Sequence, residues 1–107
     1  MNNRIVVLGA GISGVGAAVL AKRKGFNVFV SDHNKISSQN KKILENNNID
    51  WEHNGHSESK ILNADEVIKS PGISNSAEII LKLRLLKIPI ISEIEFVYRY
   101  TNAKTIA

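Results

Sequence analysis

The sequence contains no cysteine and no long apolar run. Without cysteine, disulfide scaffolds, thiol catalysis and zinc–thiolate sites are all excluded. The unbroken apolar runs are only a few residues long, whereas a helix that crosses a bilayer needs about 20. Residues 1–3 lead directly into a strand-like segment, with no signal-peptide pattern before it. These absences predict a cytoplasmic protein with no membrane span.

A concentrated positive patch is also missing. The 107 residues include 14 Lys plus Arg and 10 Asp plus Glu, for a formal charge of +4, but the cations are spread along the chain. Nucleic-acid-binding domains usually gather their cations on one face, so we expect no nucleic-acid partner, and the modest charge suits a small anionic ligand instead. At this length about 65% of the surface can be buried on folding, so residues 1–107 are expected to form a single domain.

Apolar segments of two kinds alternate along the chain. Short runs rich in β-branched residues are typical of buried strands, and segments with apolar residues every three or four positions are typical of helices. Strands are expected at 4–8, 27–31, 49–52, 66–69 and 89–91, and helices at 13–24, 37–46, 57–62, 77–86 and 93–100. This alternation predicts the α/β class, with a doubly wound, Rossmann-like parallel sheet of about five strands and flanking helices. If the strand order is 3-2-1-4-5, the first and fourth strands flank the switch point at which ligands bind.

The end of the sequence carries two further signals. Ser92 with Glu95 three residues later is a capping-box pattern, which predicts the start of the last helix. Residues 104–107 have the pattern of the beginning of a further strand. Because a strand with no helix after it is an unusual end for an α/β protein, we expect the chain to be the N-terminal part of a longer one.

The first candidate site is the segment Gly9-Ala10-Gly11-Ile12-Ser13-Gly14, a G-x-G-x-x-G pattern between a strand and a helix. In such a turn, Gly9 permits the tight bend, Gly11 lets a ligand approach the backbone, and Gly14 lets the helix pack on the strand. The free N–H groups at the helix start favour an anion. Asp32 ends the second strand, where an acid can accept hydrogen bonds from a ribose or a base. The pattern predicts a nucleotide-type ligand.

The second candidate site is Ser70-Pro71-Gly72, which follows the fourth strand. The carboxyl ends of parallel strands form the ligand crevice in doubly wound sheets, so this turn is expected to meet the glycine turn and Asp32. The hydroxyl of Ser70 and the N–H of Gly72 suit a phosphate oxygen. The alternative interpretation is an ordinary turn with no ligand.

Groups that would carry out catalysis are not evident. His33, His53 and His56 show no persuasive spacing for a metal site, and we expect them in solvated loops. The sequence also has no Ser–His–Asp arrangement and no G-x-x-x-x-G-K-[ST] loop. We therefore expect neither a catalytic residue nor a metal or other cofactor within these residues.

Three blocks of the sequence resemble a known family. VVLGAGISGVGAAVLAKRKGFNVFVSD, ADEVIKSPGIS and IPIISEIEF occur in the order and at the spacing found in the N-terminal domain of the Mur ligases that add D-glutamate to UDP-N-acetylmuramoyl-L-alanine. The resemblance extends over residues 4–107. The glycine block is shared with many dinucleotide-binding proteins, whereas the S-P-G-I and S-E-I-E-F blocks are more specific to these ligases.

The resemblance implies that the domain binds the UDP part of that substrate and not NAD. Residues 12 and 13 would contact the uracil and the diphosphate, residues 32 and 33 the uracil edge, and residues 70–72 the diphosphate. Asn34 stands where the family often has an arginine near the nucleotide. The implied UDP-binding set is Gly11, Ile12, Ser13, Asp32, His33, Asn34, Ser70, Pro71 and Gly72, with Gly9 and Gly14 as structural glycines.

The resemblance also implies what the whole protein does. A central domain with a P-loop is expected just after residue 107, and it would supply the sites for ATP, Mg²⁺ and D-glutamate in an ATP-dependent ligase of peptidoglycan and cell-wall synthesis. These 107 residues alone would bind the substrate without turnover. Two alternatives stay open. An NAD(P)- or FAD-binding module of an oxidoreductase would explain the glycine turn but not Ser70-Pro71-Gly72. A non-enzymatic nucleotide-sensing module would need a dimer interface that the sequence does not reveal.

Overall fold

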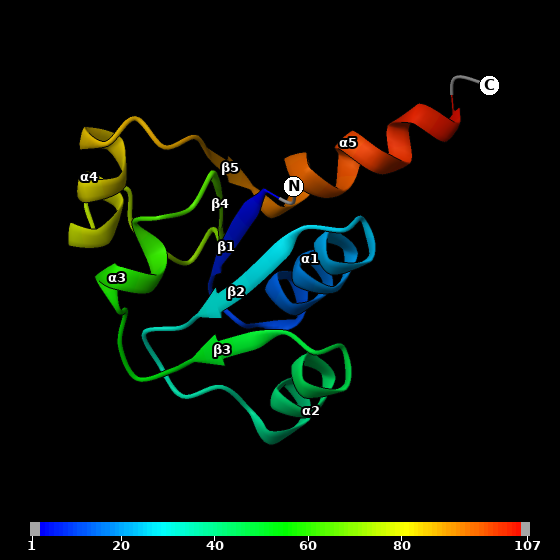
Figure 1. Ribbon diagram of the computed structural model, residues 1–107, viewed down its shortest axis with the longest axis horizontal. Coiled ribbons are helices and arrows are strands. Elements are labelled where there is room, and N and C mark those ends of the chain that lie inside the picture. Colours follow the sequence, from blue (N-terminus) through cyan, green and yellow to red (C-terminus); the bar gives the residue numbers. More distant parts are fainter. Residues whose placement is uncertain (1–2, 106–107) are drawn as a thin grey trace.

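Five short parallel strands form one sheet, as the sequence predicts, and their order is β3-β2-β1-β4-β5. The structure is a computed structural model that describes residues 3–105, and it describes the side chains up to Tyr100. Helices and strands alternate throughout (Figure 1). The elements are β1 (Arg4–Leu8), α1 (Ile12–Arg23), β2 (Asn27–Ser31), α2 (Ser38–Asn46), β3 (Asp50–Glu52), α3 (Glu58–Ile61), β4 (Glu66–Lys69), α4 (Glu78–Leu85), β5 (Ile90–Ser92) and α5 (Glu93–Thr105).

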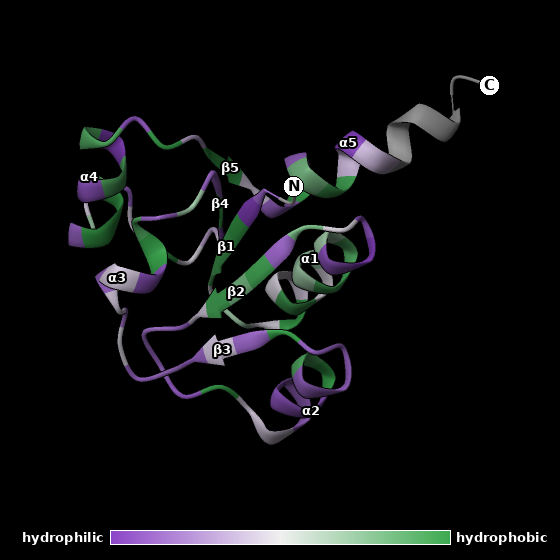
Figure 2. Ribbon diagram, in the orientation of Figure 1, coloured by the Kyte–Doolittle hydropathy of each residue, from purple (hydrophilic) through white to green (hydrophobic). Residues whose placement is uncertain are grey.

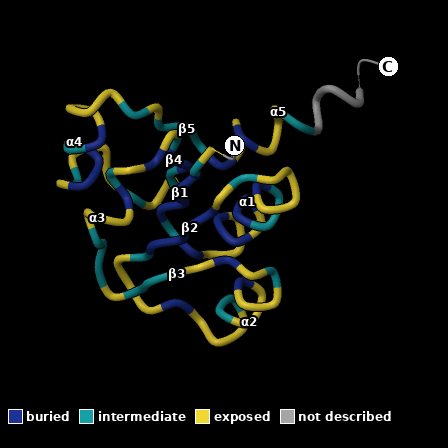
Figure 3. The backbone as a smooth tube through the Cα atoms, viewed as in Figure 1, coloured by how far each residue is buried: buried dark blue, intermediate teal, exposed yellow. Residues whose placement is uncertain are grey.

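Strand β1 lies at the centre of the sheet, and its apolar run is buried on both faces. Val6 pairs with Phe29 of β2 on one side and with Val67 of β4 on the other. Because side chains alternate along a strand, Ile5 and Val7 face one layer of helices while Val6 and Leu8 face the other. Figure 2 shows the hydrophobic residues gathered along this strand, and Figure 3 shows its burial.

Helices cover both faces of the sheet, which makes it doubly wound. Helices α1, α2 and α5 pack on one face and α3 and α4 on the other, and Figure 1 shows the two layers on opposite sides. The fully buried Phe96 anchors α5 to the first core, and Leu83 anchors α4 to the second. Full burial of a side chain of this size contributes about 1.5–3 kcal/mol. No helix within residues 3–105 is long and apolar enough to cross a membrane.

The last helix differs from the prediction. The capping box is confirmed, because Ser92 Oγ accepts from the Glu95 N–H at 3.0 Å. The helix then continues to Thr105, so the prediction of a strand beginning at residue 104 is wrong for residues 104 and 105. Residues 106 and 107 lie outside the described part of the chain. The physical reason for the longer helix is that residues 101–105 contain neither glycine nor proline, the residues that most often end one.

Candidate functional site

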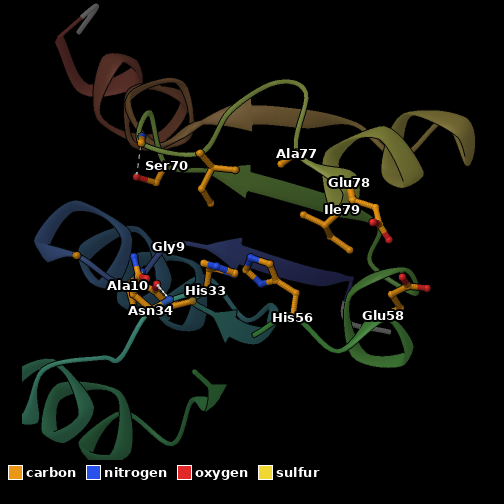
Figure 4. Close-up of a pocket in the computed structure, with 14 residues that line it drawn as sticks. Gly9, Ala10, His33, Asn34, His56, Glu58, Ser70, Ala77, Glu78 and Ile79 are labelled. Carbon is orange, nitrogen blue, oxygen red and sulfur yellow. Dashed lines mark hydrogen bonds between the residues drawn. The ribbon is translucent and has the colours of Figure 1, made fainter. Parts of the chain in front are cut away.

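The candidate site is a pocket of about 570 Å³ at the carboxyl ends of the central strands. It is lined by the turn after β1, by residues 32–34 after β2, and by Ser70 and Gly72 after β4. These loops are far apart in the sequence and adjacent in the fold, because β1 lies between β2 and β4 in the sheet. Figure 4 shows Gly9, Ala10 and Ser70 toward one end of the pocket and Glu58 and Glu78 at the other, with His33 and His56 between them.

The glycines of the turn after β1 have different surroundings. Gly9 has a φ of +105°, and a Cβ there would lie 2.6 Å from Ser70 Cβ. A Cβ on Gly14 would lie 2.0 Å from the Gly9 carbonyl oxygen. A Cβ on Gly11, in contrast, would meet nothing within 4 Å. Gly9 and Gly14 are therefore required by packing, whereas Gly11 borders open space at the edge of the pocket.

Helix α1 begins at this turn without a side-chain cap. Gly11 is its N-cap residue and provides no hydrogen bond to the first N–H groups. The first turn of α1 also contains no acidic residue. The backbone N–H groups at a helix start carry a partial positive charge and lack helical acceptors. The arrangement favours an anion at the end of the pocket that Gly11 lines.

Asp32 is hydrogen-bonded to two of the loops that line the pocket, the turn after β1 and the loop after β2. Its Oδ2 accepts a hydrogen bond from the Ala10 N–H at 2.7 Å, and its Oδ1 accepts one from the Asn34 N–H at 2.8 Å. Asn40 of α2 donates to the Ala10 carbonyl at 2.9 Å. A carboxylate has about four acceptor positions, so Asp32 fixes two loops and keeps capacity for a ligand.

The turn after β4 is held by hydrogen bonds of the Lys69 and Ser70 side chains. Lys69 Nζ donates to the Ile73 carbonyl at 2.7 Å and to the Ser70 carbonyl at 3.3 Å. The Gly72 N–H points to Ser70 Oγ across 3.4 Å. Lys69 is not among the residues predicted from the sequence, although a cation directly before Ser-Pro-Gly is a signal that could have found it. It positions the turn that carries two of the predicted phosphate contacts.

The structure brings six of the nine predicted UDP-binding residues to this pocket. The six are Gly11, Asp32, His33, Asn34, Ser70 and Gly72. Ser13 and Pro71 instead line a neighbouring groove between α1, β5 and α5. Ile12 is 87% exposed and lies toward α2. The predicted set therefore extends from the pocket into the groove beside it.

Two histidines differ from the expectation of solvated loops. His53 Nδ1 accepts from the Ile36 N–H at 3.2 Å, and His56 Nδ1 lies 2.7 Å from Ser31 Oγ. Both are only partly exposed. Both lie in the loop between β3 and α3, as expected, but they are less solvated than expected because each ring is hydrogen-bonded to a residue far away in the sequence. In the part of the chain that the structure describes, no three His, Asp or Glu side chains come together as a metal site would require.

Burial and hydrogen bonding shift the pKa values of two groups under the pocket. Burial alone would raise the pKa of Glu52, but hydrogen bonds from the Ser57 N–H and hydroxyl and from Ser31 outweigh it and lower the pKa. Burial lowers the pKa of His56, and the neighbouring His33 lowers it further. Glu52 is therefore a stable carboxylate, and the neutral form of His56 is favoured.

Carboxylates close the opposite end of the pocket. Glu58 and Glu78 both contact Lys82, the latter at 3.2 Å. The hydrogen bond from Lys82 to Glu58 is the main cause of the raised pKa of Lys82. Ile73 and Ile79 supply an apolar wall between the two ends. The pocket thus suits a ligand with an anionic group at one end and a flat, partly apolar group beside it.

The chain matches the family model described as the MurD N-terminal domain over residues 4–79. UDP-N-acetylmuramoylalanine–D-glutamate ligases from Bacteroides thetaiotaomicron and Christiangramia forsetii are 61% and 46% identical to it, over 103 and 106 residues. These alignments cover 96% and 99% of this chain but 23% and 24% of the relatives. The chain therefore spans about a quarter of the length of those curated relatives.

Solved structures agree with the fold. The UDP-N-acetylmuramate–alanine ligase of Thermotoga maritima gives a TM-score of 0.81 at 20% identity, over 95% of this chain and 23% of that one. A pseudomurein peptide ligase type C from Methanothermus fervidus gives 0.77 at 33% identity, over 94% of this chain and 21% of that one. The first likeness supports the fold alone. Because the family match covers most of the sequence, the chain belongs to the MurD N-terminal domain family.

Proposed function

We propose that this chain is the UDP-binding N-terminal domain of an ATP-dependent ligase that adds D-glutamate to UDP-N-acetylmuramoyl-L-alanine in peptidoglycan synthesis. The observation that carries the proposal is the convergence of three strand-end loops on one pocket of about 570 Å³. The relatives are named UDP-N-acetylmuramoylalanine–D-glutamate ligases. Those names supply the chemical identity of the ligand, and the pocket supplies a place that suits it.

The diphosphate would lie between the start of α1 and the turn after β4. Gly11 at the uncapped start of α1, Ser70 and Gly72 all line this end of the pocket. The donors it offers would be the first N–H groups of α1, the Ser70 hydroxyl and the Gly72 N–H, which spans 3.4 Å to Ser70 Oγ without a ligand. Hydrogen bonds to a charged acceptor are about twice as strong as those between neutral groups. The uracil would then lie along residues 32–34, where Asp32, His33 and Asn34 line the pocket.

The rest of the substrate would leave the pocket through the neighbouring groove. Ser13 and Pro71 line that groove, and each is close in sequence to a residue that lines the pocket, Gly11 or Gly72. A diphosphate at this boundary would contact both sets of residues. The N-acetylmuramoyl-L-alanine part would then extend along the groove toward α5.

The other substrates would bind elsewhere in the longer ligase. The sites for ATP, Mg²⁺ and D-glutamate would lie in the part of the relatives' length, about three quarters, that this chain does not cover. The chain alone would then bind the nucleotide substrate without turning it over. Detection of ATP-dependent ligation by these 107 residues would contradict this part of the proposal.

A chemical-shift titration tests the proposal directly. UDP-N-acetylmuramoyl-L-alanine and NAD⁺ are added in separate experiments to the ¹⁵N-labelled chain. We expect the muramoyl ligand to shift the backbone signals of Gly11, Asp32 and Gly72, and NAD⁺ to leave them unchanged. Shifts with NAD⁺ alone would favour an oxidoreductase module, and no shift with either ligand would contradict nucleotide binding by this chain.

A matched pair of serine variants locates the ligand. Ser70→Ala removes a hydroxyl that lines the pocket, whereas Ser59→Ala removes one from the exposed surface of α3. Loss of one hydrogen bond to a charged group is expected to weaken binding about tenfold for the first variant. The second should bind like the unchanged chain. Equal affinities for both variants would place the ligand away from the turn after β4.

A further inference from the structure

A polar cluster lies directly beneath the pocket and is not explained by the contacts assigned above. Its centre is Ser31, the last residue of β2, which is 0% exposed. Ser31 Oγ lies 2.8 Å from Glu52 Oε2 and 2.7 Å from His56 Nδ1, and 3.3 Å from the Gly55 carbonyl. His56 also lines the pocket, so the cluster connects a buried strand end to the ligand side.

The number of protons in the cluster determines which nitrogen of His56 carries a hydrogen. A serine hydroxyl has a single hydrogen to donate. Glu52 is the strongest acceptor near it, because a carboxylate accepts more strongly than a neutral group. Ser31 therefore donates to Glu52. Its oxygen then accepts from His56, so Nδ1 of His56 bears the hydrogen.

The remaining nitrogen of the ring is left as an acceptor. In a neutral imidazole with a hydrogen on Nδ1, Nε2 has a free lone pair. Because the Nδ1 edge is held by Ser31, the Nε2 edge is the one available to a bound molecule. His33 lies beside this ring, with centroids 6.0 Å apart, and Figure 4 shows the two rings in the middle of the pocket.

The charges around His56 come from several elements. Glu52 of β3 and Asp32 after β2 favour the protonated ring, whereas burial and His33 oppose it. Glu58 and Glu78 also line the pocket, and both are engaged by Lys82. Burial is the largest of these influences, and the net effect lowers the pKa of His56.

We propose that His56 Nε2 accepts a hydrogen bond from the uridine part of the ligand, from either the imide N–H of the base or a ribose hydroxyl. This inference rests on the proposed function. Asp32 is the acceptor that the sequence singles out, and each of its oxygens accepts one backbone N–H bond while keeping capacity for a ligand. His56 is a second acceptor in the same pocket, preset by Ser31 and Glu52, which act as positioning residues.

The tautomer can be measured without any ligand. Two-bond ¹⁵N–¹H correlation spectra of the histidine rings at pH 8 distinguish the two neutral forms. We expect His56 to carry its hydrogen on Nδ1, and Ser31→Ala to bring its spectrum toward the Nε2–H form that free histidine prefers. An Nε2–H form of His56 in the unchanged chain would overturn the proposal.

Two substitutions separate the pocket contact from the structural one. In His56→Asn the side-chain amide occupies the place of Nδ1, so it keeps a donor for Ser31 and loses the pocket-facing acceptor. In His56→Gln the amide oxygen reaches the place of Nε2 and the bond to Ser31 is lost. We expect His56→Asn to bind UDP about tenfold more weakly than the unchanged chain, and His56→Gln to stay within about threefold.

Ligand analogues identify the donor. The unchanged chain and His56→Asn are titrated with UDP, 3-methyl-UDP, 2′-deoxy-UDP and 3′-deoxy-UDP. One analogue should bind the unchanged chain about tenfold more weakly than UDP, and His56→Asn should not distinguish that analogue from UDP. Loss of binding by 3-methyl-UDP identifies the imide, and loss by a deoxy analogue identifies a hydroxyl.

The outcomes keep this inference apart from the proposed function. If UDP shifts the unchanged chain but His56→Asn binds UDP equally well, the role of His56 is structural and the inference fails while the function stands. If all four ligands bind the unchanged chain alike, the inference also fails. If UDP produces no shift in the unchanged chain, the proposed function itself fails.

Discussion

The turn after β1 and the turn after β4 lie side by side at one end of the sheet, yet they are held in opposite ways. The first is held by the absence of side chains, because a Cβ on Gly9 or Gly14 would overlap its neighbours. The second is held by side chains that are present, chiefly the ammonium of Lys69 on two carbonyl groups. Substitutions in the first turn should therefore lower the stability of the whole domain. Substitutions in the second should mainly loosen the turn itself.

The largest expected effect is that of Gly14→Ala. The added Cβ would lie 2.0 Å from a backbone oxygen of Gly9, which no side-chain rotation relieves. We expect a loss of about 3 kcal/mol or more in the free energy of unfolding, and a thermal midpoint lower by more than about 12 °C. Gly16→Ala in the same helix is the control, since a Cβ there meets nothing within 4 Å. Equal midpoints for the two variants would contradict the packing role of Gly14.

The second effect tests the turn after β4. Lys69→Met keeps the length of the side chain and removes the ammonium that bonds to Ser70 and Ile73. We expect a loss of about 1–2 kcal/mol in urea unfolding, with faster amide exchange confined to residues 70–73. Lys42→Met, on the exposed surface of α2, should change neither quantity. Unchanged exchange in Lys69→Met would show that the turn holds its shape without the ammonium.

The third effect separates folding from binding within the glycine turn. Gly11 is an N-cap residue with extended backbone angles, a conformation that serine adopts well. Gly11→Ser should leave stability unchanged or raise it by a few tenths of a kcal/mol. Its hydroxyl would cover the helix N–H groups, so UDP binding should weaken about tenfold in the chemical-shift titration. A stable variant with full affinity would contradict the diphosphate position.

The smallest effect concerns Glu93, which is 6% exposed and lies against the glycine turn. Burial raises the pKa of its carboxyl. The folded state therefore binds the proton more tightly than the unfolded state does, and ionisation costs stability as the pH rises through the folded pKa. Glu93→Gln should have the higher thermal midpoint at pH 7, and the difference should shrink toward pH 4. A difference that does not depend on pH would contradict this account.

The sequence predicts the fold well because the relevant signals are local. The apolar run of β1 and the capping box of Ser92 and Glu95 are each recognised from a few neighbouring residues. The alternation of strands and helices indicates a parallel sheet, and the structure gives its order as β3-β2-β1-β4-β5. The end of α5 is predicted wrongly, because no local residue stops the helix and the pattern of residues 104–107 resembles a strand.

The site is predicted only in part, for a related reason. The glycines of residues 9–14, Asp32 and Ser70 belong to short patterns whose chemistry can be inferred from the residue types. The cluster under the pocket joins residues that are 21 and 25 positions apart, Ser31 with Glu52 and with His56. Such contacts depend on how two loops meet above the sheet. Composition and spacing alone do not encode them.

Helix α5 connects the glycine turn to a distant part of the molecule. Its first residue, Glu93, lies against Gly14, and the helix runs without interruption for 13 residues. At 1.5 Å per residue, it is about 20 Å long. A tilt of about 5° at its first turn would displace its far end by about 2 Å over that length. The helix thus has the geometry of a lever, in which a small change of angle at the glycine turn would become a displacement of about 2 Å at the far end.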